Sequence, residues 1–367
     1  MRATSTNKVM SCSTERSSIP GQSISRMEKS CPFLSLSHPG KTGQAAALHE
    51  RTSNMKAIRI HAYGGQELMQ LEDAPVPTCG ADDLLVRVVA AGINPIDWKM
   101  RSGAMAAQMP KSFPMTLGSD AAGVVTALGG SVSGFELGDE VCFYAEFARG
   151  GTYAEYVAVD ASQVAKKPRT SSFATAAALP MAGQAAWTAL IEAAHVERGL
   201  RVLIHGGAGA LGAIAVQLAK ERGAHVIATA SGNGLALVKS LGADEVVDYR
   251  TQHFEQIARD IDIVLDTLGG PTQEASWATL RQGGILVATA MPPPPERAAA
   301  AGVRAAFVFT PPRGAVLAQL AERVDDGRVR IVVGQEFALA DAAQAHRLGE
   351  AGKARGKMVL HVGAPGG

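Results

Sequence analysis

Glycines recur at a fixed spacing in the segment Gly207-Ala208-Gly209-Ala210-Leu211-Gly212. The segment follows a short apolar run at 201–205 and opens a helix-like pattern over 210–222. In that context the first glycine permits a tight turn, the second lets the backbone approach a diphosphate, and the third allows close packing of helix on strand. The N-terminus of the helix offers free N–H groups and a partial positive charge. The pattern predicts a turn that binds the pyrophosphate of a nicotinamide dinucleotide, and a glycine-rich turn without a ligand is the alternative.

The end of the next strand indicates which dinucleotide binds. A site for NAD places Asp or Glu there, about 20 residues on, to bind the ribose 2′-OH. This chain has Ala-Ser-Gly-Asn at 230–233, and no carboxylate follows until Asp244. A carboxylate would repel a 2′-phosphate, whereas Ser231 and Asn233 can donate hydrogen bonds to it. We therefore expect NADP(H), although no Arg or Lys stands at 231–234. The alternative is that Ser231 only caps a helix beginning near Leu235.

Metal chemistry has little support in the sequence. The cysteines are scattered and include no C-x-x-C pair, and the histidines after Met55 form no cluster: Cys12, Cys31, Cys79 and Cys142, and His61, His195, His205, His225, His253, His346 and His361. A zinc alcohol dehydrogenase needs a set of Cys or His ligands that leaves one position open. We therefore expect that the protein has no catalytic zinc. We expect its cysteines to be free thiols in a reducing compartment.

Bulk composition indicates a soluble globular chain of about two domains. Of 367 residues, 47% are hydrophobic and 19% charged, and the formal net charge is +1. This balance favours neither nucleic acid nor an anionic membrane as a partner. No apolar run approaches the roughly 20 residues that span a bilayer.

The elements that position these residues change character along the chain. Short apolar runs punctuated by Gly, Pro and Asp predict a β-rich domain, barrel-like or sandwich-like, from Met55 to about Pro180. Helical segments follow at 174–179 and 185–194, with Pro180 and Gly183 expected to interrupt them. Beyond them, strands and helices alternate. This alternation predicts an α/β fold with a parallel sheet covered on both faces. The expected strands are 201–205, 225–230, 245–248, 262–266, 285–290 and 305–309, with an amphipathic helix at 314–326 and a last strand at 357–362.

Residues 1–54 are rich in Ser and Thr, poor in acids, and lack a sustained hydrophobic period. An organelle transit peptide has such a composition, but no clear basic amphipathic helix is present. We favour a disordered or wrongly assigned extension, with Met55 as the start of the folded protein, over a targeting segment.

From Met55 onward the chain resembles the zinc-independent, zeta-crystallin-like quinone oxidoreductase branch of the medium-chain dehydrogenases/reductases. The glycine turn carries this resemblance together with further segments in matching order over about 310 residues. These are Ala90-Ala91-Gly92-Ile93-Asn94-Pro95-Ile96-Asp97, Leu117-Gly118-Ser119-Asp120-Ala121-Ala122-Gly123, Phe135-Glu136-Leu137-Gly138-Asp139-Glu140-Val141, Gly151-Thr152-Tyr153-Ala154-Glu155-Tyr156, Leu241-Gly242-Ala243-Asp244 and Arg355-Gly356-Lys357.

The resemblance implies a GroES-like substrate domain at 55–180, to which 315–367 returns, and a Rossmann domain at 181–314, with the active cleft between them. It implies NADPH-dependent reduction of a quinone or of the C=C bond of an enone or alkenal. It also implies a homodimer, with the edge strand 305–309 as a candidate contact. We expect a cytoplasmic location, or an organelle if 1–54 is a transit peptide. The alternatives are a non-catalytic, crystallin-like NADPH-binding protein and, with less support, an alcohol dehydrogenase.

The resemblance also assigns roles to individual residues. It places Asn94 beside the nicotinamide, Thr188 near a phosphate or ribose, Ser231 at the 2′-phosphate and Tyr249 at the adenosine end. The pyrophosphate turn receives Ala208, Gly209, Ala210 and Leu211. Strands flanking the nicotinamide receive Leu286, Val287 and Ala288, then Phe307 to Phe309, and the closing motif receives Lys357.

One departure concerns catalysis. Several relatives have a tyrosine two residues after the position of Asp97, where this chain has Trp98 and Lys99. Lys99 is therefore our candidate for stabilising the developing enolate or donating a proton, with Asn94 and water nearby. The alternative is a solvated surface lysine. We expect Asp97 and Asp120 to be structural.

Overall fold

The computed structural model describes residues 54–354 and 356–363, whose strands form three sheets. The expectations about residues 1–53 lie outside the described residues. The first strand, β1, begins at Asn54, one residue before the start that the sequence predicts.

One sheet is entirely parallel. Its strands lie in the order β11 (Glu245–Asp248), β10 (His225–Ala230), β9 (Arg201–Ile204), β12 (Ile261–Asp266), β13 (Leu280–Ala288) and β14 (Arg304–Phe307). The chain runs outward from β9 to β11, then returns to β12 on the other side of β9. The strand order therefore reverses between β9 and β12, and sheets of this kind bind ligands at the carboxyl ends of the strands beside such a reversal.

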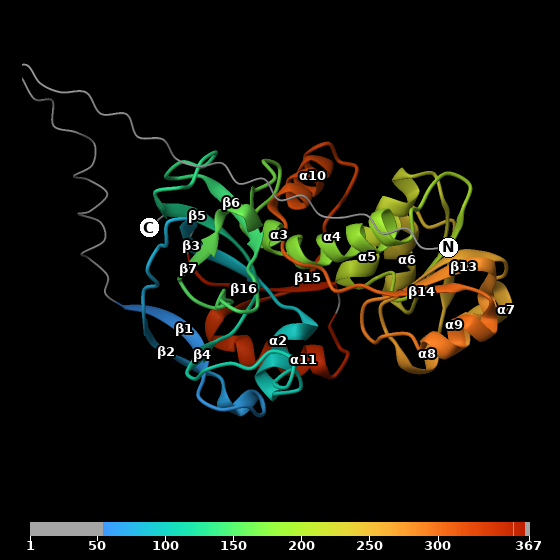
Figure 1. Ribbon diagram of the computed structural model, residues 1–367, viewed down its shortest axis with the longest axis horizontal. Helices are drawn as coiled ribbons and strands as arrows, with labels where there is room; N and C mark the ends of the chain where they lie inside the picture. The colour runs from blue at the N-terminus through green and yellow to red at the C-terminus, as the bar shows by residue number, and fades with distance from the viewer. Residues whose placement is uncertain (1–53, 355, 364–367) are drawn as a thin grey trace, which may run out of the picture. The chain divides into compact units, whose positions relative to one another are not determined.

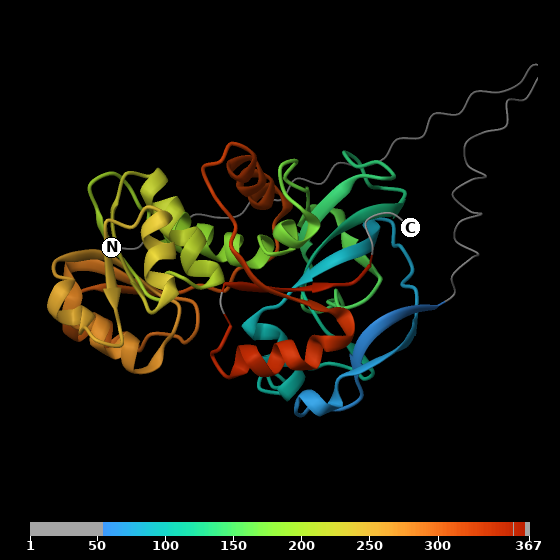
Figure 2. The ribbon, with the colours of Figure 1, turned by 180° about the vertical axis from the view of Figure 1, so that it is seen from behind.

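Helices cover this sheet on both faces. Val202 and Ile204 of β9 pack on one side, in the cluster that holds α5 (Ala210–Glu221) and α6 (Asn233–Ser240). Leu203 packs on the other side, and Figures 1 and 2 show α8 and α9 on the face of β13 and β14 opposite α5 and α6. The helices of this second face are α7 (Phe254–Ile257), α8 (Gly270–Ser276), the short η4 (Trp277–Thr279) and α9 (Pro295–Ala301). The predicted doubly covered parallel sheet is confirmed.

The β-rich part is built from both ends of the chain. Its larger sheet has the order β15 (Val333–Ala338), β16 (Lys357–His361), β3 (Asp83–Gly92), β5 (Asp120–Leu128), β6 (Glu140–Tyr144) and β8 (Val164–Lys166), with β7 (Tyr156–Asp160) paired to β3. A smaller sheet has the order β2 (Gln70–Pro75), β1 (Asn54–Ile60) and β4 (Met115–Thr116). The antiparallel pairing of β16 with β3 brings the last strand into a sheet that starts some 270 residues earlier.

Helices around this part complete the fold. They are α2 (Pro95–Ser102), α3 (Phe173–Ala177), α4 (Pro180–Trp187), the π-helix η3 (Thr188–Ala193), α10 (Gly314–Asp325) and α11 (Ala342–Glu350). Short 3₁₀ turns lie at η1 (Gln66–Leu68), η2 (Ala161–Gln163) and η5 (Leu339–Asp341).

The helical segment is interrupted before Pro180, as expected, because α3 ends at Ala177 and α4 begins at Pro180. The expectation of a break at Gly183 is wrong. Pro180 is at the first turn of α4, where a missing N–H costs no hydrogen bond. Gly183 lies inside the helix, and a Cβ there would be 3.0 Å from Cδ1 of Leu179 and of Leu320. The glycine therefore permits the close packing of α10 on α4.

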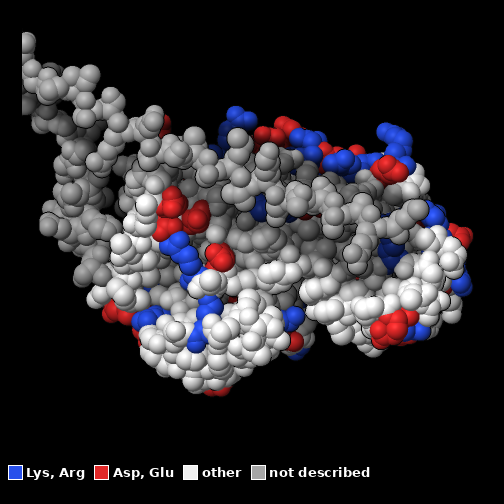
Figure 3. Space-filling model, viewed as in Figure 1, with Lys and Arg blue, Asp and Glu red and all other residues white. Residues whose placement is uncertain are grey.

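No helix among the described residues is long and apolar enough to cross a membrane. On the face drawn in Figure 3, Lys and Arg side chains lie next to Asp and Glu side chains, consistent with the near-zero net charge.

Candidate functional site

The glycine turn joins β9 to α5. Gly206 has a φ of +67° and forms the left-handed step of the turn. The motif predicts the tight turn at Gly207, so the turn lies one residue earlier than expected. The amides of Gly206 and Gly207 bond to the Thr229 hydroxyl (3.1 Å) and carbonyl (2.9 Å) at the end of β10. A Cβ on Gly212 would lie 2.2 Å from the Gly206 carbonyl oxygen. The third glycine thus lets the helix begin directly against the turn.

The start of α5 is an anion-binding end. Gly209 is its N-cap and has no side-chain cap, so Ala210, Leu211 and Gly212 carry the first amides of the helix, which have no acceptor within it. Ala208 precedes them on the same turn. These amides and the helix dipole are the donor set that a pyrophosphate requires, so the residues fit the predicted dinucleotide.

His205 lies directly before this turn, at the end of β9. It is fully buried and contacts Ser276 Oγ through Nε2 (2.8 Å) and Thr229 Oγ1 through Nδ1 (3.4 Å). Burial lowers its pKa to about 4, against a smaller opposing effect of Asp266. His205 is therefore a neutral support for the strand ends that hold the turn.

The end of β10 brings Ser231 and Tyr249 together. Ser231 Oγ donates to the Tyr249 hydroxyl (2.9 Å), and the Tyr249 ring is 56% exposed. The N-cap of α6 is Gly232, without a side-chain cap, so the alternative in which Ser231 caps the helix is wrong. Asn233 is the exposed first residue of α6. The predicted 2′-phosphate residues thus present neutral hydrogen-bonding groups at one strand end.

Thr188 is held by an arginine that the sequence analysis missed. Arg313 Nη2 donates to Thr188 Oγ1 (2.8 Å), and the same guanidinium forms an ion pair with Glu192 (2.9 Å). The hydrogen bond from Arg313 lowers the pKa of Glu192. The main-chain N–H of Arg313 donates to Gln184 Oε1 (2.7 Å), which fixes the segment after β14 on α4.

Asn94 and Lys357 meet although 263 residues separate them. Lys357 Nζ bonds to Asn94 Oδ1 and to Asp120 Oδ2 (2.8 Å), and Asn94 Nδ2 bonds to the same Asp120 oxygen (2.9 Å). All three side chains are buried, so the ammonium and the carboxylate compensate each other. Asp120 Oδ1 also accepts from the amide of Met181 on α4 (3.0 Å). Asp120 therefore links Asn94, Lys357 and the start of α4, and its structural role stays a prediction.

Asp97 forms a second buried cluster beside the first. Its carboxylate accepts from the main-chain N–H of Asn94 (2.7 Å), from Ser119 Oγ (3.0 Å) and from the Tyr153 hydroxyl (3.0 Å). Burial raises the pKa of Asp97 to about 6, although the hydrogen bonds from Asn94 and Tyr153 lower it. The Tyr153 hydroxyl is also 3.2 Å from His346 Nε2.

Lys99 is half-buried on α2, and no described residue forms a side-chain hydrogen bond or ion pair with it. Neighbouring Trp98 packs instead against His346 on α11, with ring centroids 6.0 Å apart. A catalytic role for Lys99 stays a prediction.

The strand residues assigned to the nicotinamide differ in accessibility. The side chains of Leu286, Val287 and Ala288 are fully buried in the sheet, so only their backbone can face a ligand. Phe307 and Phe309 are 43% and 60% exposed, because the chain leaves the sheet edge there. The Phe309 ring lies 5.9 Å from that of Phe147, in the segment after β6.

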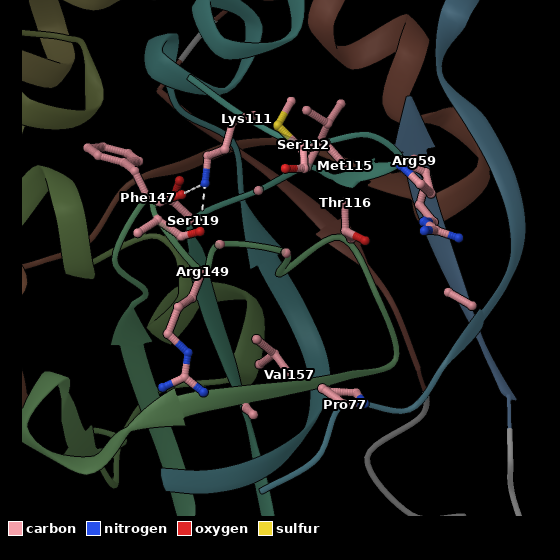
Figure 4. A pocket seen from close by; sticks show the side chains of 18 of the residues that line it. Arg59, Pro77, Lys111, Ser112, Met115, Thr116, Ser119, Phe147, Arg149 and Val157 are labelled. Atoms are coloured by element: carbon pink, nitrogen blue, oxygen red, sulfur yellow. Dashed lines mark hydrogen bonds between the residues drawn. The ribbon is translucent and has the colours of Figure 1, made fainter. Parts of the chain in front are cut away.

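A cavity of about 600 Å³ lies in the β-rich part, lined by residues that include Lys111, Ser119, Phe147, Arg149 and Asp97 (Figure 4). Lys111 Nζ donates to the carbonyl oxygens of Phe147 and Ala148, which ties the segment before β4 to the one after β6. Burial lowers the pKa of Lys111. No motif in the sequence marks Lys111, because it stands alone in a segment rich in apolar and proline residues.

Comparisons with known proteins agree with this geometry. Residues 80–169 match the family model "Alcohol dehydrogenase GroES-like domain", and residues 241–360 match "Zinc-binding dehydrogenase". The chain is 36% identical over 341 residues to the 2-methylene-furan-3-one reductase of Solanum lycopersicum, covering 87% of this chain and 84% of that one. It is 34% identical over 346 residues to the chloroplastic NADPH-dependent alkenal/one oxidoreductase of Arabidopsis thaliana, covering 90% and 86%. The structure of the quinone oxidoreductase from Coxiella burnetii superposes with a TM-score of 0.79 at 35% identity, covering 84% of this chain and 100% of that one.

The residues do not fit zinc, despite the name of one family model. Within residues 54–354 and 356–363, no three His, Cys, Asp or Glu side chains come together as a metal site. Cys142 is fully buried, and burial raises the pKa of its thiol to about 12, which opposes the thiolate that zinc needs.

Proposed function

Since the chain belongs to the zinc-independent quinone oxidoreductase branch of the medium-chain dehydrogenases/reductases, we propose that it is an NADPH-dependent reductase of quinones or of α,β-unsaturated carbonyls. The observation that carries the proposal is the glycine turn, whose free helix amides lie next to a strand end with neutral Ser231 and Tyr249. An acidic strand end would favour NADH instead.

The cofactor is NADP(H), and the chain has a residue set to hold it. Ala208, Gly209, Ala210 and Leu211 hold the pyrophosphate, and Ser231, Asn233 and Tyr249 bind the 2′-phosphate end. We assign Thr188, whose hydroxyl accepts from Arg313, to a phosphate or ribose, and buried Asn94 to the nicotinamide end. The bound cofactor supplies a hydride, and the protein supplies position and electrostatic environment.

The test is a turnover panel of quinones, alkenals and enones with NADPH and NADH, together with binding of each cofactor followed by fluorescence. We expect NADPH oxidation with at least one substrate class and tighter binding of NADPH than of NADH. Tight NADPH binding without turnover of any class would support a non-catalytic, crystallin-like protein. Alcohol-dependent reduction of NADP⁺ would support an alcohol dehydrogenase.

We propose the domain division 55–180 with 315–367 for the substrate side and 181–314 for the cofactor side. The cavity at Ser119 and Phe147 supports the first assignment, and the glycine turn supports the second. We expect NADPH to protect amides of 201–235 from hydrogen exchange, and quinone to protect those of 110–120 and 145–151.

Lys99 stays a candidate for stabilising enolate charge. If it acts so, Lys99→Met lowers kcat about tenfold or more at unchanged NADPH affinity, whereas Lys353→Met, at an exposed lysine, has no effect. Equal rates for both variants would identify Lys99 as a surface lysine.

A homodimer through β14 is part of the proposal. Among the described strands, β14 is at the edge of the parallel sheet and pairs with β13 alone. Phe307 is exposed there beside an apolar hollow that includes Pro292 and Ala305. An exposed edge with apolar neighbours is suited to pairing with a second copy. Phe307→Asp is expected to raise the monomer fraction in sedimentation, whereas Leu137→Asp, at another exposed apolar residue, is not.

We propose a cytoplasmic location, with an organelle as the alternative. A fluorescent protein fused behind residues 1–54 separates the two: diffuse cytoplasmic signal supports the first and import supports a transit peptide.

A further inference from the structure

A continuous chain of hydrogen bonds runs through the buried β-rich part and has no role in the function described so far. Ser119 Oγ is 3.0 Å from Asp97 Oδ1, the Tyr153 hydroxyl is 3.0 Å from Asp97 Oδ2, and His346 Nε2 is 3.2 Å from that hydroxyl. The four residues come from the segment before β5, from α2, from the segment before β7 and from α11. Each is at most 4% exposed.

One end of this chain opens onto the cavity. Both Ser119 and Asp97 contribute to its lining, and Figure 4 shows Ser119 on the side where Lys111 and Phe147 lie. Asp97 also accepts the main-chain N–H of Asn94, and Asp120, the residue after Ser119, binds the Asn94 side chain. The chain of hydrogen bonds therefore ends at Ser119, next to Asp120, whose carboxylate accepts from Asn94, the residue that we assign to the nicotinamide.

The groups in the chain allow two arrangements of protons. The Tyr153 hydroxyl and the Ser119 hydroxyl can each donate or accept, so a proton on Asp97 is compatible with the same heavy-atom positions. His346 keeps to its neutral form, because burial, with a smaller effect of Arg101, lowers its pKa to about 3. Its Nδ1 is buried without a described partner.

The charges around Asp97 keep both of its states within reach near neutral pH. Burial and the negative charge of Asp120 on β5 raise the pKa of Asp97. The main-chain N–H of Asn94, the charge of Lys357 on β16 and the Tyr153 hydroxyl lower it. The resulting pKa is about 6. Burial and Asp97 raise the pKa of Tyr153 well above 10, so the phenol stays protonated.

We propose that Ser119 is the proton donor of the reductase and that Asp97 resupplies it. This inference rests on the proposed function. When the β-carbon of an enone accepts a hydride, the C=C electron pair moves toward the carbonyl and leaves an enolate. The α-carbon then takes the proton of the Ser119 hydroxyl, and the serine oxygen takes the proton of the Asp97 carboxylic acid. Asp97 regains a proton from water after product release, so that the substrate gains one hydride and one proton in total. With a quinone, an oxygen takes the proton instead.

A purely structural role predicts different behaviour. In that case Asp97 only anchors α2 to the segment before β5, and substitutions lower stability without changing the pH dependence of turnover. Proton supply by Asp97 predicts that kcat falls as pH rises above about 6, since the acid form is lost.

The first experiment compares kcat against pH for the wild type and for Ser119→Ala, Ser119→Thr, Asp97→Asn and the control Ser102→Ala, an exposed serine at the end of α2. We expect Ser119→Ala to lower kcat with an enone about 100-fold, in the range typical of general acids, at unchanged NADPH affinity. Ser119→Thr restores the hydroxyl and most of the rate, and Asp97→Asn removes the pH break. Ser102→Ala behaves as wild type.

A second measurement needs no cofactor or turnover. Infrared difference spectra between pH 5 and pH 8 are expected to show a buried carboxylic acid that disappears in Asp97→Asn and shifts in Ser119→Ala. If the wild type turns over no quinone or enone, the proposed function fails. If it does turn over and either Ser119→Ala keeps its kcat, or the carboxylic-acid band is unchanged by Asp97→Asn, the proton-donor proposal fails while the proposed function stands.

Discussion

Acidification is expected to destabilise this protein through the histidine directly before the glycine turn. His205 is fully buried between Thr229 and Ser276, and burial lowers its pKa from 6.5 to about 4. A group whose pKa is lower in the folded state contributes stability that is complete above its unfolded pKa. That stability is lost as pH falls from 6.5 toward 4, because the unfolded chain binds a proton that the folded chain rejects.

The size of the effect follows from the two pKa values. Between pH 8 and pH 5 the unfolded state becomes almost fully protonated at this histidine and the folded state only by about a tenth. Integrating the difference in bound protons gives a loss of about 2 kcal/mol in the free energy of unfolding. Asp97 and His346 also change the stability over this range, in opposite directions, and they do so equally in a variant that lacks only His205.

The assay is urea unfolding at pH 8 and pH 5 of the wild type, of His205→Gln and of the control His253→Gln, whose ring is 74% exposed. We expect the wild type and the control to lose about 2 kcal/mol more than His205→Gln on acidification. An equal loss in all three proteins would refute a neutral, buried His205.

Three further predictions concern the cofactor turn and the buried ion pair. Gly212→Ala places a methyl group 2.2 Å from the Gly206 carbonyl oxygen, so NADPH binding should weaken at least tenfold in a fluorescence titration while the circular dichroism is kept; unchanged affinity would contradict the packing role. Ser231→Asp puts a negative charge at the 2′-phosphate end, so the preference for NADPH over NADH should fall about tenfold or more, and an unchanged ratio would move that phosphate elsewhere. Lys357→Met leaves Asp120 as an uncompensated buried charge and should lower the free energy of unfolding by about 3–5 kcal/mol. The control Lys56→Met, which breaks an exposed pair with Asp73, should change it by less than about 1 kcal/mol. Equal effects of the two substitutions would show that the buried pair contributes little.

Much of the cofactor half was predictable, because its signals are local. The strand residues of β10 and β11 were predicted at their observed bounds, since short apolar runs between turns report burial on both faces. The start of α5 at Ala210 follows from the glycine spacing. The break predicted at Pro180 is present, since α4 begins there, but the same reasoning failed at Gly183, where packing against α10 favours a continuous helix.

The β-rich half was harder to read, because its contacts join distant segments. Neither spacing nor composition indicates that β16 pairs with β3, or that Lys111 bridges to Phe147 and Ala148. The resemblance named Asn94 and Lys357, but only the fold shows that they share Asp120.

The sequence by itself determined what depends on neighbours along the chain: a parallel sheet with a glycine turn, and a strand end at Ser231 without an acid. Only the tertiary structure decided what depends on burial and on distant partners. Asp97 is an ordinary carboxylate in the sequence, and enclosure between α2, α11 and β5 raises its pKa to about 6 and links it to Ser119. The physical reason is that loss of water and the placement of charges act through space, so no local pattern reports them.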